Sequence, residues 1–264
     1  MKCSATAKSF GMLVDGCAGA HDLQSGYSAG GRCLKITLNQ GGWAVANFNE
    51  QGLAYMREGK YEEAIRCFSA AVERHPDDPA GYINIGTVLV AAGEEEKALD
   101  CFRQALALDE RAAAAYYGMG TVHYKREQFA KAKDMFERAL QLGLNDADTH
   151  FMLGMSLWRL EMPRMALPYL QRAAELNKMD VEALFQLGLC LAVLDYVDEA
   201  KRYFEKTLEL DSRHADAYYN LGVIYAYKDE LDAARHMFAA ALEAKPDHVL
   251  AGYGKKLMEK RLAP

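Results

Sequence analysis

The chain has 264 residues, of which 51% are hydrophobic, and its formal net charge is −6. An acidic protein without a stripe of Lys and Arg lacks the positive charge that supplies most of the affinity for nucleic acids and anionic membranes. No apolar run is long enough to span a bilayer. We therefore expect a cytoplasmic protein that binds neither nucleic acid nor membrane.

The first segment, residues 1–44, differs from everything that follows. It is rich in Gly and has neither helical nor strand periodicity, so we expect it to be disordered. Two alternatives stay open. Lys2, the apolar patch from Phe10 to Val14 and Cys17 follow the order of a lipoprotein signal. The segment would instead be non-native if Val45 is the true start of the protein.

From Val45 onward, a Gly recurs every 34 residues and an Ala follows each Gly at the twelfth residue. The glycines are Gly52, Gly86, Gly120, Gly154, Gly188 and Gly222, and the alanines are Ala64, Ala98, Ala132, Ala166, Ala200 and Ala234. Four residues after each Ala stands a large apolar residue: Phe68, Phe102, Phe136, Leu170, Phe204 or Phe238. This period is typical of helix-turn-helix units that stack into a solenoid. It predicts an all-α array of six repeats at residues 45–78, 79–112, 113–146, 147–180, 181–214 and 215–248.

A final helix at residues 249–264 is expected to cap the array. Solenoids need such a cap because their last unit otherwise exposes an apolar end. We expect Leu250, Tyr253 and Leu257 on its inner face, with its charged residues in water.

Nothing in the sequence indicates catalysis or a cofactor. The seven His are scattered, and the six Cys form neither a C-x-x-C pair nor a zinc-site spacing. Cys67 and Cys101 hold equivalent positions in their repeats, as structural thiols would. We therefore expect no enzyme activity, no metal and no cofactor.

The repeats resemble the tetratricopeptide repeat, whose pattern W-x2-L-G-x2-Y, then A-x3-F, then P, is followed over residues 45–248. The stretches 80–84, 115–118, 132–137, 166–172 and 215–220 also resemble the YrrB-type tetratricopeptide proteins of Gram-positive bacteria, which have six units and a terminal helix. This resemblance implies a right-handed superhelix whose first helices line a concave groove. It implies a protein-interaction scaffold or adaptor.

Carried over by register, the groove positions define the candidate partner-binding surface. We expect an exposed apolar strip there, although core positions are the alternative for these rings. Its apolar members are Tyr117, Tyr124, Phe151, Met155, Trp158, Phe185, Leu189 and Tyr219. The polar candidates are the acidic ladder Asp148, Glu182 and Asp216, the cations Lys125 and Arg159, and the sixth-position amides Asn84, Gln186 and Asn220.

These residues predict a protein or peptide partner with apolar anchors and a basic stretch. Two alternatives remain. One is self-association, in which the groove or the final helix docks on another copy. The other is a non-catalytic subunit of an enzyme complex, and the resemblance points to tRNA sulfuration as its setting.

Overall fold

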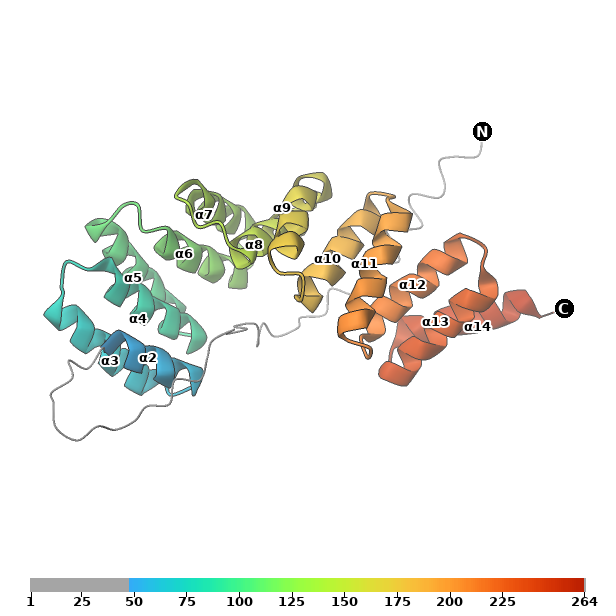
Figure 1. Ribbon diagram of the computed structural model, residues 1–264, viewed down its shortest axis with the longest axis horizontal. Helices are drawn as coiled ribbons and strands as arrows, with labels where there is room; N and C mark the ends of the chain where they lie inside the picture. The colour runs from blue at the N-terminus through green and yellow to red at the C-terminus, as the bar shows by residue number, and fades with distance from the viewer. Residues whose placement is uncertain (1–47, 264) are drawn as a thin grey trace. The chain divides into compact units, whose positions relative to one another are not determined.

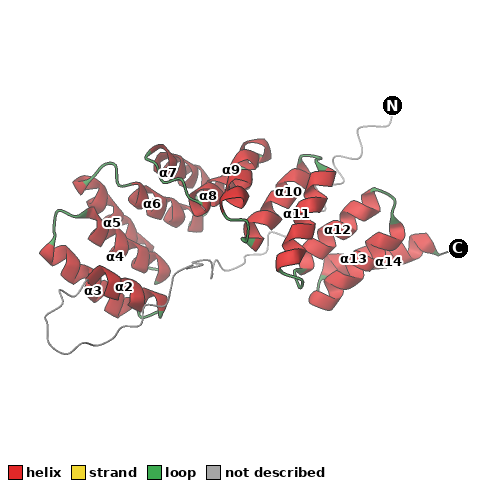
Figure 2. Cartoon of the chain, viewed as in Figure 1, coloured by secondary structure: helices red, strands yellow, loops and turns green. Residues whose placement is uncertain are grey.

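The computed structural model describes residues 48–263, so the predictions for residues 1–44 lie outside the described residues. Every regular element within 48–263 is a helix (Figure 2), which confirms the all-α prediction. The described residues fall into two compact units, 48–110 and 111–263, and each is treated by itself.

The N-terminal unit consists of two antiparallel helix pairs (Figure 1). Its helices are α2 (Phe48–Arg57), α3 (Tyr61–Arg74), α4 (Pro79–Ala91) and α5 (Glu95–Leu108). The buried side chains of Ala64, Phe68 and Val88 form its main apolar cluster.

The C-terminal unit continues the same pairing and adds one last helix. Its helices are α6 (Ala113–Lys125), α7 (Phe129–Gln141), α8 (Ala147–Arg159), α9 (Pro163–Leu176), α10 (Val181–Val193), α11 (Val197–Leu210), α12 (Ala215–Tyr227), α13 (Leu231–Ala244) and α14 (Val249–Leu262). Each helix packs mainly on its neighbours in the chain, as expected for a solenoid. We call α4, α6, α8, α10 and α12 first helices, because each begins a 34-residue unit.

The two helices of a unit meet where the repeated Gly faces the repeated large residue. A Cβ atom added at Gly120 would lie 2.8 Å from Cε1 of Phe136, and one at Gly188 would lie 2.8 Å from Cε1 of Phe204. Both phenylalanine side chains are fully buried, as are all six repeated alanines. The Gly therefore leaves the space that the ring fills, which confirms the sequence register.

The turn inside each unit needs one residue with a left-handed backbone. Gly59 and Gly93 provide it in the first two units, with φ of 73° and 82°. In the other four units the same position is held by Glu127, Glu161, Asp195 and Asp229, with φ of 57°, 60°, 66° and 62°. Residues other than Gly pay a steric cost in this conformation, so packing of the array imposes it on them.

First helices other than α6 are capped by the last residue of the preceding unit, whereas α6 follows Ala112 and lacks a side-chain cap. Asp146 and Asp180 accept hydrogen bonds through Oδ1 from the backbone N–H groups of Thr149 and Ala183, at 2.7 and 3.0 Å. His214 accepts the equivalent bond of α12 through Nδ1, from the N–H of Ala217 at 3.1 Å. The same role is played by Asp78 for α4 and by His248 for α14. These side chains satisfy donors that a helix start otherwise leaves unpaired.

The predicted inner face of α14 is wrong in part. Tyr253 and Leu257 are 66% and 40% exposed, and the side chains that pack inward are Ala251 and Met258. The helix meets α12 and α13 along the edge that carries Ala251, because small residues allow close approach there.

Phe136→Ala is expected to lower the free energy of unfolding by about 3–5 kcal/mol, because it empties a site between α6 and α7. Coupling in a solenoid runs between neighbours, so the thermal transition should also broaden or split. Lys131→Ala, on the exposed side of the same helix, is the matched control and should change stability by less than about 0.5 kcal/mol. An unchanged melt for Phe136→Ala would contradict the register.

Candidate functional site

The candidate site is the outward surface of the first helices in the C-terminal unit. The fifth residue of each 34-residue unit in this part of the chain is aromatic, and we call these side chains the fifth-position rings. The sequence predicted that they form one continuous exposed strip, but they do not. Tyr117 on α6 and Phe151 on α8 are partly exposed. Phe185 on α10 and Tyr219 on α12 retain only 5% and 2% of their surface. Among these four rings, partial exposure is therefore confined to those on α6 and α8.

The two buried rings are covered by the histidines that cap the following helices. The centroids of the Phe185 and His214 rings lie 4.5 Å apart, and those of Tyr219 and His248 lie 5.1 Å apart. On their inner sides the same two rings contact Phe204 and Phe238. Each ring thus lies between an imidazole and a phenylalanine, which removes it from solvent.

Two further residues of the candidate partner-binding surface are also buried. Leu189 is 6% exposed and packs in the core with Leu187 and Cys190. Asn220 is 6% exposed, and its Nδ2 donates to the carbonyl of Asp216 at 2.8 Å. Its amide therefore already has an acceptor in its own helix. The predicted exposure of Leu189 is wrong, and the Asn220 side chain is buried as well.

The surface that remains open holds an aromatic cluster at the ends of α6 and α8. Tyr124 and Phe129 meet edge to face, with ring centroids 5.3 Å apart. The guanidinium of Arg159 lies over the Phe129 ring, 4.5 Å from its centroid, and the side chain is exposed. Trp158 and Met155 are partly buried, so they both pack on the core and present surface to solvent.

Arg159 and Tyr124 also interact electrostatically. Burial raises the pKa of the Tyr124 hydroxyl, while the neighbouring guanidinium of Arg159 acts in the opposite direction. A cation held over a ring loses little further freedom when it meets an acceptor. Arg159 is thus oriented before any ligand arrives. The role of Phe129 as its platform was missed from the sequence, because Phe129 lies outside the repeated groove positions.

Carboxylates lie at the starts of α8 and α10, and those of α8 are at the opposite end of the helix from Arg159. Asp148 keeps much of its surface in water, but partial burial raises the pKa of its carboxyl. The charges of Asp146 and Asp180 raise this pKa further. The three carboxylates thus repel one another, and a cation placed among them would relieve that repulsion.

The other two members of the acidic ladder have partners within the chain. Glu182 accepts a hydrogen bond from Nε2 of Gln186 at 2.8 Å. Asp216 Oδ1 lies 3.0 Å from Nε2 of His248, which is buried. Because Nδ1 of His248 accepts from a backbone N–H, its Nε2 must carry the proton that it shares with Asp216. The charge of the predicted ladder is therefore most available at Asp148.

Two predicted residues, Lys125 and Asn84, belong to different units. Lys125 is exposed at the last residue of α6. Asn84 is partly exposed on α4 and belongs to the N-terminal unit, so it is not placed together with the others.

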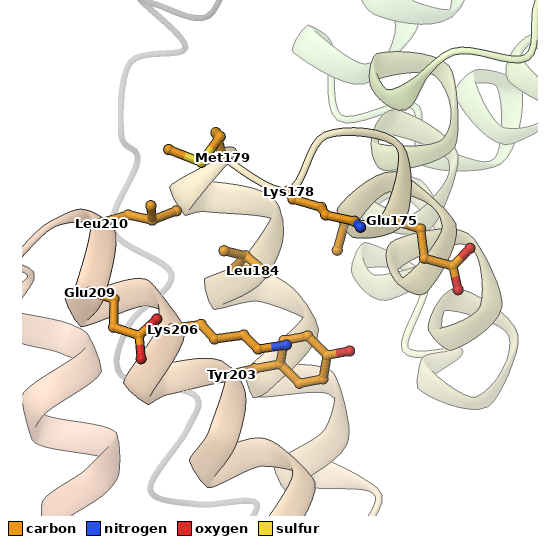
Figure 3. A pocket seen from close by; sticks show the side chains of 9 residues that line it. Glu175, Lys178, Met179, Leu184, Tyr203, Lys206, Glu209 and Leu210 are labelled. Carbon is orange, nitrogen blue, oxygen red and sulfur yellow. The ribbon is translucent and has the colours of Figure 1, made fainter.

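A second feature of the C-terminal unit is a hollow of about 360 Å³ beside α9, α10 and α11 (Figure 3). Figure 3 shows the Lys206 amino group beside the Tyr203 ring, 4.8 Å from its centroid. The other lining residues are Ala174, Glu175, Lys178, Met179, Leu184, Glu209 and Leu210. The lining carries two carboxylates and two ammonium groups, so its net charge is zero and it does not favour a ligand of either sign.

The described residues show no arrangement for metal or thiol chemistry. Within 48–263, no group of three or more His, Cys, Asp or Glu side chains is placed to hold a metal ion. Cys190 donates its thiol hydrogen to the carbonyl of Pro163, and burial raises its pKa to about 12. Burial likewise raises the pKa of Cys101. Thiols with raised pKa values are poor nucleophiles at neutral pH. In the same part of the chain, no helix combines the length and the apolar character that crossing a membrane requires.

Comparisons with known proteins agree with this architecture. Family models of the tetratricopeptide repeat match residues 49–113, 111–179 and 195–255. The chain is similar to the crystal structure of YrrB, a TPR protein with an unusual peptide-binding site, with 48% identity and a TM-score of 0.67 over 72% of this chain and 97% of that chain. It also shares its fold with PilF of Pseudomonas aeruginosa, at 18% identity and a TM-score of 0.70, over 80% of this chain and 96% of that one. No curated protein matches the chain.

Asp148→Asn is expected to stabilise the protein at pH 7 by about 0.2–1 kcal/mol, the usual size of an exposed charge interaction. The folded-state pKa of Asp148 is raised, so the native state binds this proton more tightly than the unfolded chain. Ionisation therefore costs stability above the folded pKa, and the gain from Asn should vanish below the ordinary pKa of Asp. Urea unfolding at pH 7 and at about pH 3 checks this, with the exposed loop variant Asp77→Asn as control. Destabilisation at pH 7 would contradict the repulsive environment of Asp148.

Proposed function

Because the chain belongs to the tetratricopeptide repeat family, we propose that it is a non-enzymatic adaptor that grips a peptide segment of a partner protein on its first helices. The family and the fold support a protein-interaction scaffold. YrrB, at 48% identity, is itself a TPR protein with a peptide-binding site. The free thiols Cys67, Cys101 and Cys190 fit a reducing cytoplasm as the place where it acts.

The observation that carries this proposal is the open aromatic surface on α6 and α8. Tyr117, Tyr124, Phe151 and Trp158 each keep part of their surface in water while their remaining atoms pack on the core. Rings that are held rigidly and exposed in part lose little entropy when a ligand covers them. Such aromatic residues dominate the energetics of protein interfaces.

Charge defines the chemistry of the partner. Asp146, Asp148 and Asp180 lie at the starts of α8 and α10, and the repulsion of Asp148 by the other two costs stability that a bound cation would recover. Arg159 lies at the opposite end of α8, where its exposed guanidinium is held over the Phe129 ring. We therefore propose a peptide with apolar anchors and at least one Lys or Arg.

The test is a selection of short random peptides on the immobilised full-length protein, followed by calorimetry. The proposal expects enriched peptides that combine aromatic or aliphatic residues with Lys or Arg. Trp158→Ala should weaken binding of such a peptide by about 2 kcal/mol, roughly 30-fold, because it removes a central aromatic anchor.

Tyr253→Ala on α14 is the matched control, since it removes an exposed ring outside the site. Because Trp158 also packs on the core, both variants are melted, and binding is measured well below the transition. Peptides that bind Trp158→Ala and the parent protein equally would refute this surface as the site.

A second candidate function is self-association through α14. Val249, Tyr253 and Leu257 are 81%, 66% and 40% exposed. Their spacing of four residues places them on one side of the helix, where they form an apolar stripe. A single stripe of this kind is the seam that helices use to pair.

Self-association predicts a concentration-dependent dimer in sedimentation velocity that dissociates in Tyr253→Lys. The ammonium group introduced by Tyr253→Lys would be buried in the interface without a partner, which is strongly unfavourable. Lys255→Ala, on the same helix, should leave the dimer intact. A monomer at all concentrations would eliminate this second function.

A further inference from the structure

The fifth-position rings divide into two classes that follow the identity of the next helix cap. Tyr117 and Phe151 are partly exposed, and the following first helices are capped by Asp146 and Asp180. The buried rings of Phe185 and Tyr219 precede helices that are capped by histidine. The capping residue and the exposure of the preceding ring therefore change together.

The geometry gives a physical reason for this correlation. One imidazole does two tasks, since its Nδ1 accepts the helix N–H while its ring face lies on the aromatic residue of the preceding unit. A carboxylate can make the same hydrogen bond, but it has no ring to lay over the neighbour. Tyr253 of α14 holds the equivalent position without a following unit in the described residues, and it is 66% exposed.

We infer that the capping residue at positions 146, 180, 214 and 248 is a specificity-determining residue, which opens or closes the aromatic ring of the unit before it. Asp146 and Asp180 leave two rings open, while His214 and His248 close the next two. This inference rests on the proposed function in one respect, namely that peptides use these rings. Among the fifth-position rings, it leaves only Tyr117 and Phe151 to receive an apolar anchor.

The spacing of the anchors follows from helix packing. Because α6 and α8 pack mainly on α7 and only slightly on each other, they lie at least as far apart as two packed helices, about 8–10 Å. An extended peptide advances about 3.3 Å per residue, so Tyr117 and Phe151 would receive anchors at least about three residues apart. Asp146 and Asp148 at the start of α8, the helix that carries Phe151, favour Lys or Arg in such a peptide.

A reciprocal exchange of caps tests the inference without any ligand. His214→Asp and Asp180→His both keep a side chain that can accept the helix N–H, so the cap is preserved while the covering ring is removed or added. Solvent accessibility of each phenylalanine ring can be measured by NMR, as the relaxation of its protons by a dissolved gadolinium chelate. The fully buried Phe204 serves as the internal standard.

His214→Asp should raise the relaxation of the Phe185 ring several-fold, toward the value of Phe151 in the parent protein. Asp180→His should lower that of Phe151 in turn. Either change, in a variant whose circular dichroism is that of a folded protein, supports the inference. Unchanged relaxation of the Phe185 and Phe151 ring protons in both variants would overturn it. The two exchanges are independent, so if one variant fails to fold, the other still decides the question.

Two acetylated peptides then test whether the solvent accessibility of a ring determines peptide affinity. They are Phe-Lys-Lys-Phe, with two anchors, and Phe-Lys-Lys-Phe-Lys-Lys-Phe, with three. The parent protein should bind both with affinities within about threefold, because its third ring is closed. His214→Asp should bind the three-anchor peptide about tenfold more tightly than the two-anchor peptide. Equal affinities in that variant, despite an opened Phe185, would overturn the role of the cap in specificity. If neither peptide binds any of the proteins while the rings respond as stated, the proposed function fails but the control of ring access stands.

Discussion

The contact between a glycine on the first helix and a large apolar residue on the second is the constraint on which each unit depends. At Gly120 and Gly188 there is no room for even one more carbon atom. The two helices can approach this closely only because one supplies a backbone and the other a ring. Since this contact fills the interior of the unit, the opposite side of the first helix is free to vary without loss of the fold.

The exposure of the outward side of the first helices differs along the C-terminal unit. On α6 and α8 the outward aromatic residues keep part of their surface in water, beside carboxylates that repel one another. On α10 and α12 the equivalent rings are covered by histidines and contribute to the core. The first arrangement costs stability, because ionised Asp148 is unfavourable in the folded chain. The second gains apolar burial. A costly charge beside exposed rings is typical of a binding surface rather than of a region that serves stability alone.

The sequence was sufficient to predict the fold, because a period of 34 residues fixes which side chains meet within a unit. Gly120, Ala132 and Phe136 lie where the register places them. The candidate surface was predicted only in part. Phe185 and Tyr219 were expected to be exposed, since the register assigns them the same outward position as Tyr117. Their cover comes from His214 and His248 in the next cap, and a residue-by-residue reading of the histidines treated them as scattered. The last residue of the unit is Asp at positions 78, 146 and 180, Ala at 112 and His at 214 and 248, so the difference is present in the aligned repeats.

The end of the array gave a second discrepancy with the same origin. Tyr253 was assigned to the inner face of α14, but its register position is the outward fifth position of a unit that has no second helix in the described chain. Helical spacing alone cannot distinguish the two faces of a short helix in which Gly252, Gly254 and Ala251 carry little hydrophobic surface. Register along the array, rather than periodicity within one helix, decides which side is buried.

The central claim is that a peptide lies across α6 and α8. Intermolecular nuclear Overhauser effects between a selected, isotope-labelled peptide and the full-length protein test it most directly. The account predicts contacts from the apolar anchors of the peptide to the rings of Tyr117, Tyr124, Phe151 and Trp158, with none to Phe185 or Tyr219. Contacts that concentrate instead on α14, or on the hollow around Tyr203 and Leu184, would contradict it.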